Sequence, residues 1–154
     1  ILGITVSTVF TGIMQSSGAM IGILFALSSS GVINDFKFVF PLILGAHIGT
    51  CVVTVIGAIG TNIEAKRASW SHVLFNVIGA VIAALMYPFY NYIIPLISQN
   101  NITREIANAH TIIQTVNSVI FLIFYEFLLV VFVVYCYLNT INSVYKFLNI
   151  NTIR

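Results

Sequence analysis

The sequence predicts an all-α integral membrane protein, and three observations lead to that class. Of the 154 residues, 59% are hydrophobic and only 6% are charged, whereas a soluble domain carries about 25% charged residues. The mean hydropathy is +1.04. All charged residues except Glu126 lie at or beyond the ends of four long stretches, each long enough to cross a membrane as a helix of about 20 residues. The stretches are 1–34, 38–63, 68–103 and 106–145.

Residues 1–33 are predicted to form two apolar half-helices around a polar break. The halves, 1–14 and 19–27, are separated by Gln15-Ser16-Ser17-Gly18. Glycine weakens a helix by roughly 1 kcal/mol relative to alanine, and serine hydroxyls compete for backbone hydrogen bonds. The first half carries hydroxyls at spacings of three and four, which we expect to share one helix face. These residues are Thr5, Ser7, Thr8 and Thr11.

Residues 38–59 are predicted to form a second broken helix, interrupted at Gly45-Ala46-His47-Ile48-Gly49-Thr50. Hydrocarbon tolerates interrupted helices only where they line a protein-enclosed or watered cavity. A half-helix that begins at a break presents N–H groups to an anion, and one that ends there presents carbonyls to a cation. Two breaks therefore predict an anion and cation site without Lys or Arg. The alternative is that the small residues only let helices pack closely.

Helices are also predicted over 68–97 and 105–137. Pro88 kinks or ends the first of them, and its neighbours Tyr87, Tyr90 and Tyr92 fit an interfacial aromatic belt. The tail, 138–154, is rich in asparagine and is expected to leave the bilayer. The transmembrane part thus covers 1–137. Basic residues in the short loops favour a cytoplasmic C-terminus.

The remaining composition restricts the class of function. No basic cluster predicts nucleic-acid binding, and Cys51 and Cys136 lie inside apolar runs, where we expect small buried hydrophobes. Histidines on separate helices show no metal-ligand spacing, and no acid orients a histidine beside a serine. We expect no enzyme and no cofactor. Because residue 1 is not methionine and already lies in an apolar run, we also expect a longer protein.

Individual residues remain open between structural and functional roles. His47 either contacts substrate or senses pH, or donates a structural hydrogen bond across its break. His72 and His110 are expected to cap helices or to form interhelical hydrogen bonds. Glu126 is the one acid inside a predicted span, which by default indicates function, and Arg104 is too distant along one helix to be its partner.

Both breaks resemble motifs of the type II sodium/phosphate cotransporter family. The stretch Thr11 to Ala19 resembles its glutamine-serine-serine signature, and Leu44 to Thr50 resembles its glycine-alanine-asparagine-isoleucine-glycine-threonine motif. Lys66 to Asn76 is similar to its basic-Ala-x-x-x-His-x-x-Phe-Asn segment, and Ala109-His110-Thr111 is a fourth likeness. The likeness covers about residues 3–125.

The resemblance implies one of two inverted repeats, the second, with a re-entrant hairpin over 1–33. Substrate and sodium would bind between this repeat and a first repeat of the same chain, or a second copy. It also implies that the tail leads toward a PhoU-like cytoplasmic domain. The implied binding residues are Gln15, Ser16, Ser17, Gly45, His47, Gly49 and Thr50. Further candidates are Thr11, Asn76 and Glu126.

This sequence departs from the family pattern at three places. Gly18 stands where a third serine is usual, His47 replaces an asparagine, and Ile113-Gln114 replaces Phe-Asn after His110. These departures bear on substrate and ion coupling.

We expect a secondary transporter of the cell membrane that couples import of inorganic phosphate to sodium, with no metal other than sodium. One alternative is transport of another oxyanion or an organic phosphate. Another is a membrane scaffold subunit that does not transport. A membrane enzyme built on Ser16 and His47 is the remaining alternative.

Overall fold

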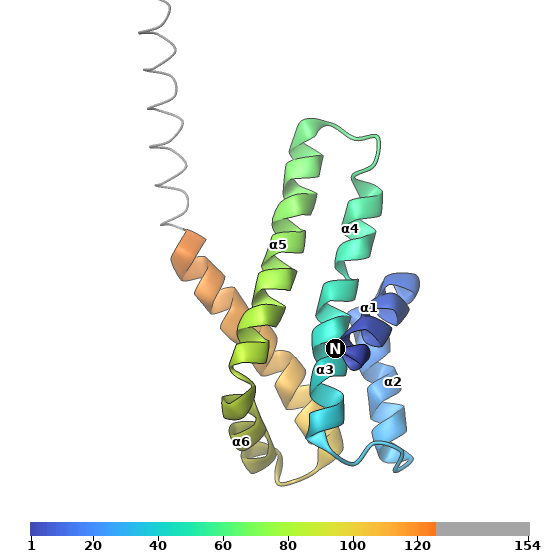
Figure 1. Cartoon of the computed structure of the whole chain (residues 1–154), viewed down its shortest axis with the longest axis vertical. Helices are drawn as coiled ribbons and strands as arrows, with labels where there is room; N and C mark the ends of the chain where they lie inside the picture. Colours follow the sequence, from blue (N-terminus) through green and yellow to red (C-terminus); the bar gives the residue numbers. More distant parts are fainter. Residues whose placement is uncertain (126–154) are drawn as a thin grey trace, which may run out of the picture. The chain divides into compact units, whose positions relative to one another are not determined.

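The structure is a computed structural model that describes residues 1–125. Within this range the chain forms helices and connecting turns, with no strand. The helices are α1 (Leu2–Met14), α2 (Ser17–Ser29), α3 (Phe36–Gly49), α4 (Cys51–Gly57), α5 (Ile63–Leu85) and α6 (Tyr87–Ser98), and a further helix spans Ile102–Tyr125 (Figure 1). The chain divides into two compact units, Ile1–Asn117 and Ser118–Arg154. Glu126, the end of the predicted helix 105–137 and the tail 138–154 lie outside the described residues.

Three helical segments are long and apolar enough to cross a membrane: Phe36–Gly57, Ile63–Leu85 and Ile102–Tyr125. α1 and α2 have 13 residues each. Each is therefore about 20 Å long, which is shorter than a hydrocarbon core of about 30 Å. The described chain is thus all-helical, as the composition predicts, and it contains three candidate membrane spans and a short helical hairpin.

The break after α1 has a local cause. Gln15 adopts a left-handed conformation, with φ 57° and ψ 22°, which ends α1. Ser16 is extended, and its Oγ accepts a hydrogen bond of 3.2 Å from the Ala19 backbone N–H at the start of α2. A serine N-cap is among the most favourable helix starts. The predicted polar break between the two half-helices is therefore confirmed at Gln15 and Ser16.

The second predicted break is wrong in its extent. Gly45 to Gly49 are helical, and only Thr50 separates α3 from α4. Thr50 itself has helical torsions, φ −63° and ψ −22°, and its hydroxyl donates to the His47 carbonyl at 2.6 Å. A threonine that hydrogen-bonds back in this way perturbs a helix without unwinding it. The glycines stay helical because another helix packs against them.

The predicted helix over 68–97 is divided into α5 and α6. α5 begins at Ile63, before the predicted start, because the Asn62 side chain accepts a hydrogen bond of 2.9 Å from the Ala65 backbone N–H. α5 ends at Leu85, and Pro88 lies in the first turn of α6. Proline is tolerated there because its missing N–H would have no helical partner. The expectation that Pro88 ends a helix is confirmed.

The core of the first unit surrounds α3. Residues from α2, α3, α5, α6 and the helix Ile102–Tyr125 are buried together. The largest fully buried side chains among them include Leu24, Ile43, Tyr90 and Ile106. Tyr90 was expected in an interfacial belt, but it packs 6.0 Å from the Phe40 ring inside this core, whereas Tyr92 is exposed.

Candidate functional site

The tip of the α1–α2 hairpin presents Gln15 and Ser16 at the surface of the described chain. The C-terminal end of α1 and the N-terminal end of α2 meet there. The first N–H groups of a helix have no intrahelical partner. Ser16 Oγ accepts a hydrogen bond from one of them, the N–H of Ala19. Ser17 and Gly18 are the first two residues of α2. The tip thus places carbonyl groups, amide N–H groups, a hydroxyl and a carboxamide in one small region.

α1 packs directly on α3 through small residues. A Cβ built at Gly49 would lie 2.5 Å from the Thr11 Cβ and 2.7 Å from the Thr8 carbonyl oxygen. A Cβ built at Gly45 would meet the Ile4 carbonyl oxygen in the same way. Gly45 and Gly49 are therefore four residues apart on a face that must be free of side chains. Their spacing is that of small residues at close helix contacts in membranes.

Two hydroxyls of α1 bind backbone carbonyls of α3 across this contact. Ser7 Oγ donates to the Leu42 carbonyl at 2.5 Å, and Thr8 Oγ1 donates to the Gly45 carbonyl at 3.2 Å. The predicted hydroxyl face is confirmed for Ser7, Thr8 and Thr11, which face α3. Thr5 is an exception, because it is exposed and its hydroxyl bonds to the Ile1 carbonyl of its own helix.

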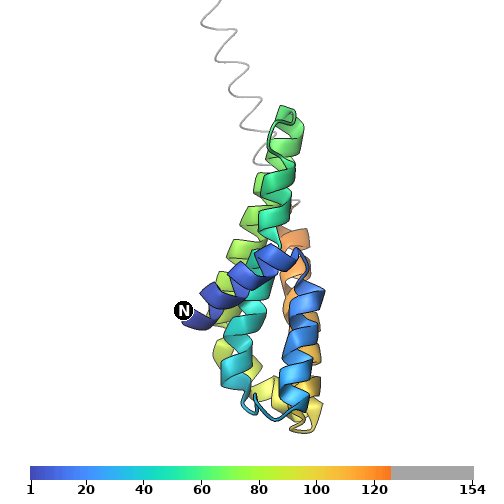
Figure 2. The ribbon, with the colours of Figure 1, turned by 90° about the vertical axis from the view of Figure 1, so that its right-hand side faces the viewer.

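Successive residues of α1 contact successive residues of α3 and α4. Gly3 lies against Pro41, Thr11 against Gly49, and Gly12 against Val52. α1 therefore runs in the same direction as α3 and α4, and it carries the Gln15–Ser16 tip toward α4 (Figure 2). Thr11 is buried, and no described residue bonds its hydroxyl.

His47 lies between the two glycines in sequence but packs on another neighbour. Its side chain is only 2% exposed, and its ring centroid lies 5.0 Å from that of His110 on the helix Ile102–Tyr125, with an interplanar angle of 58°. Within residues 1–125, neither ring nitrogen of His47 has a hydrogen-bond partner, and neither does His110 Nε2. The expected structural hydrogen bond of the His47 ring is therefore not formed to any described group.

Asn76 belongs to a separate polar cluster on α5. Its amide nitrogen donates to the His72 carbonyl at 3.0 Å and lies 3.1 Å from His72 Nε2. His72 Nδ1 lies 3.2 Å from the Thr54 hydroxyl of α4. The predicted interhelical hydrogen bond of His72 is thus confirmed. The hydrogen bonds described for the Asn76 side chain are both with His72.

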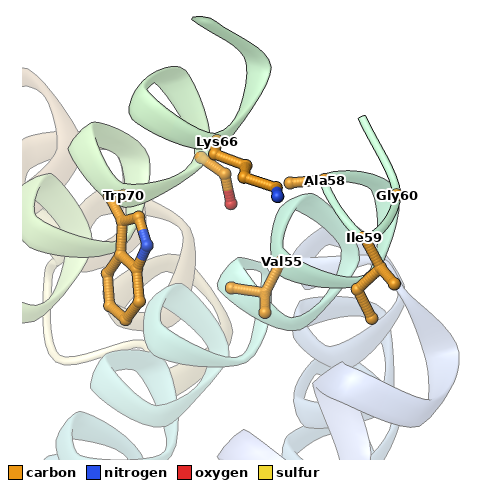
Figure 3. Close-up of a pocket in the computed structure, with 7 residues that line it drawn as sticks. Val55, Ala58, Ile59, Gly60, Lys66 and Trp70 are labelled. Carbon is orange, nitrogen blue, oxygen red and sulfur yellow. The ribbon is translucent and has the colours of Figure 1, made fainter. Parts of the chain in front are cut away.

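A shallow pocket of about 290 Å³ lies between the end of α4 and the start of α5. Figure 3 shows the Lys66 amine extending across it toward Ala58, with the Trp70 ring along its side. None of the predicted binding residues lines it. A lysine and a tryptophan near one end of a span are typical of a membrane–water interface, so this pocket does not define the candidate site. It is lined by Val55, Ala58, Ile59, Gly60, Lys66, Ser69 and Trp70.

Two close contacts between distant helices were not predicted from the sequence. One is the His47–His110 pair, because the two residues were assigned to separate motifs. The other is at Gly79, where an added Cβ would lie 2.5 Å from the amide nitrogen of Asn117. Both pairs join α3 or α5 to the helix Ile102–Tyr125. Residues so far apart in sequence give no local signal of their proximity.

The fold and the candidate site define a helical protein whose described part contains three helices suited to a membrane and a short hairpin with a polar tip. The chain is similar to an uncharacterized protein, YqeW, of Bacillus subtilis (strain 168), with 31% identity over 119 residues. The match covers 76% of this chain but only 38% of that protein's length. No family model matches the chain. No solved structure matches it either.

Proposed function

We propose that this chain is part of a secondary transporter that imports inorganic phosphate together with sodium. The observation that carries the proposal is the meeting of two helix ends at Gln15 and Ser16. The N-terminal N–H groups of α2 and the Ser16 hydroxyl suit an anion, and the C-terminal carbonyls of α1 suit sodium. The resemblance of the hairpin and of the Gly45–Thr50 segment to the type II sodium/phosphate cotransporters supports the same assignment.

The absence of basic residues from the hairpin fits a dipole-based site. Residues 1–34 contain no charged side chain. A phosphate at the tip would therefore be held by amide N–H groups, a hydroxyl and the Gln15 carboxamide, and its charge would be offset by bound cations. Helix ends supply such partial charges without a permanent basic group.

The exposed tip supports a site completed by a second half. Gln15, Ser16 and Gly18 are exposed in the described chain, whereas a transport site must be enclosed by protein on one side at a time. In the proposed protein, a related hairpin faces this one, supplied by another part of the chain or by a second copy. Rocking of the two halves around the site then exposes the anion to either side of the cell membrane.

Gly45 and Gly49 act as positioning residues in this proposal. They bring α1 against α3, and so fix the direction in which the hairpin tip points. Thr50 lies at the junction of α3 and α4, where a single residue interrupts the helix. The unwound segment expected there is not part of the proposed site.

The test is radiolabelled phosphate uptake into proteoliposomes that contain the full-length protein, with and without an inward sodium gradient. We expect uptake that depends on the gradient, and at least a tenfold loss in Ser16→Asn. Asparagine remains a good N-cap, so this variant removes the hydroxyl while preserving the start of α2.

Ser30→Ala is the matched control for Ser16. Its hydroxyl bonds only to the Leu27 carbonyl of its own helix, and we expect unchanged uptake. Uptake that ignores the sodium gradient, or that is equal in Ser16→Asn and the wild type, would contradict the proposal. Gradient-driven uptake of a different oxyanion, with none of phosphate, would favour the alternative substrate class.

A further inference from the structure

The His47–His110 pair, buried at His47 and half-buried at His110, is a polar cluster that the proposed hairpin site does not use. The rings lie 5.0 Å apart, centroid to centroid, and join α3 to the helix Ile102–Tyr125. His47 is buried, with only 2% of its surface exposed. Among the described residues, three of the four ring nitrogens have no hydrogen-bond partner: both of His47, and Nε2 of His110. A buried polar atom without a hydrogen-bond partner destabilises the fold, which indicates a ligand at the pair.

The charged side chains on the helices around the pair lie at the starts of those helices. α1 and α2 contain no titratable side chain. On α3 and α4, the other titratable groups are Lys37, which is exposed at the start of α3, and Cys51, which is buried. On α5, His72 is bonded to Thr54 and Asn76, and Glu64, Lys66 and Arg67 are exposed at its start. On the helix Ile102–Tyr125, Arg104 is exposed and the buried Glu105 interacts with Asp35 at the other end of α3.

The chemistry of imidazole favours a proton as this ligand. Sodium is a hard cation and prefers oxygen ligands. Zinc and similar metals take at least three protein ligands, and within residues 1–125 no three His, Cys, Asp or Glu side chains are grouped to hold one. A proton bonds to one ring nitrogen and can be shared with a second through a hydrogen bond. A neutral imidazole has one N–H and one lone pair, so a protonated ring can donate to the lone pair of its neighbour.

We propose that His47 and His110 bind one proton between them. This proton is taken up together with phosphate as an additional coupling ion, which rests on the function proposed above. The proton comes from the water on the side to which the site is open. It forms an N–H bond on one ring, which becomes an imidazolium and donates a hydrogen bond to the other ring. Reopening to the opposite side returns the proton to water and leaves both rings neutral.

The burial of the pair makes this binding depend on the anion. A lone imidazolium in apolar surroundings is disfavoured, so the empty site holds neutral rings. A bound phosphate offsets the charge, because Coulomb interactions are strong where the dielectric constant is low. Both sites adjoin α3, on different faces: Thr11, four residues before Gln15, packs on Gly49, and His47, two residues before Gly49, packs on His110. Each ligand therefore raises the affinity for the other.

Nitrogen-15 NMR of histidine-labelled protein in vesicles tests the proton directly. His72→Asn removes the signal of the third histidine within residues 1–154. We expect neutral rings in sodium chloride at about pH 7 and one imidazolium per pair after addition of inorganic phosphate. The new signal should be lost in His47→Asn and in His110→Asn. Rings whose charge is unchanged by phosphate from about pH 5 to about pH 8 would overturn the inference.

Proton counting during uptake separates this inference from the proposed function. A trapped pH dye and labelled phosphate together give the number of protons that enter with each phosphate. We expect one proton fewer per phosphate in His47→Asn and in His110→Asn than in the wild type, and no change in His72→Asn. Sodium-driven uptake with the same ratio in all four proteins would overturn the proton site and leave phosphate transport standing. Absence of uptake in the wild type would refute the transport proposal, while the NMR result would still decide the proton site.

Discussion

Gly45→Ala adds one methyl group at the point where α1 lies closest to α3. The new Cβ would meet the Ile4 carbonyl oxygen and would lie 2.7 Å from the Ser7 Cβ. A backbone oxygen and a Cβ are fixed by the helix that carries them. α1 must therefore move away from α3 as a body, and its hydrogen bonds to α3 must lengthen.

The size of the effect follows from three contributions. Overpacking of a close contact costs about 1–3 kcal/mol. The hydrogen bonds of Ser7 and Thr8 to α3 are weakened, and each contributes roughly 0.6 kcal/mol in a membrane protein. Alanine gains about 1 kcal/mol of helix propensity over glycine. The free energy of unfolding should therefore fall by about 1–3 kcal/mol, dominated by the overpacking.

Gly22→Ala is the matched control. It makes the same chemical change inside α2, at a position where no described atom lies within 4 Å of the added Cβ. We expect this variant to be as stable as the wild type or more stable, by up to about 1 kcal/mol. The assay is denaturant unfolding of the full-length protein in detergent micelles. Equal stability of Gly45→Ala and Gly22→Ala would refute the close α1–α3 contact.

Three further outcomes are expected. Gln15→Gly should raise the free energy of unfolding by about 1 kcal/mol, because glycine adopts the left-handed conformation without strain. The same variant should abolish sodium-driven phosphate uptake. A variant that transports normally would show that Gln15 is not part of the site. Ser7→Ala should lower that free energy by roughly 0.6 kcal/mol through loss of its bond to the Leu42 carbonyl. Denaturant unfolding would detect this loss, whereas an unchanged midpoint would contradict this bond. Gly79→Ala should cost less than Gly45→Ala, because its Cβ meets the flexible amide of Asn117; an equal loss in the same assay would show that this amide cannot move.

The sequence predicts the class and the hairpin because both depend on local properties. A scarcity of charged residues over long stretches predicts membrane helices, whichever neighbours those helices pack against. The break at Gln15 and Ser16 is also local, since an N-cap serine and the residue before it determine where α1 ends and α2 begins. The effect of Pro88 follows for the same reason, because proline lacks a backbone N–H and is disfavoured in a helix interior, although Pro41 lies inside α3 and Pro95 inside α6.

The role of Gly45 and Gly49 was decided by tertiary structure. Two glycines near a threonine predict a break as readily as they predict a close contact, because helix propensity alone penalises them in either case. Only the position of α1 distinguishes the two outcomes. Its backbone fills the space that side chains would occupy, so the glycines remain helical and serve as a contact surface.

The pairing of His47 with His110 has the same origin. The two residues are 63 positions apart in the sequence, and neither has a local pattern that specifies the other. The sequence by itself determined that this protein has apolar helices with a polar hairpin tip, because hydropathy and capping act over a few neighbouring residues. Only the packing of α3 between α1 and the helix Ile102–Tyr125 decided which polar groups are buried together, because burial and contact depend on helices that are distant along the chain.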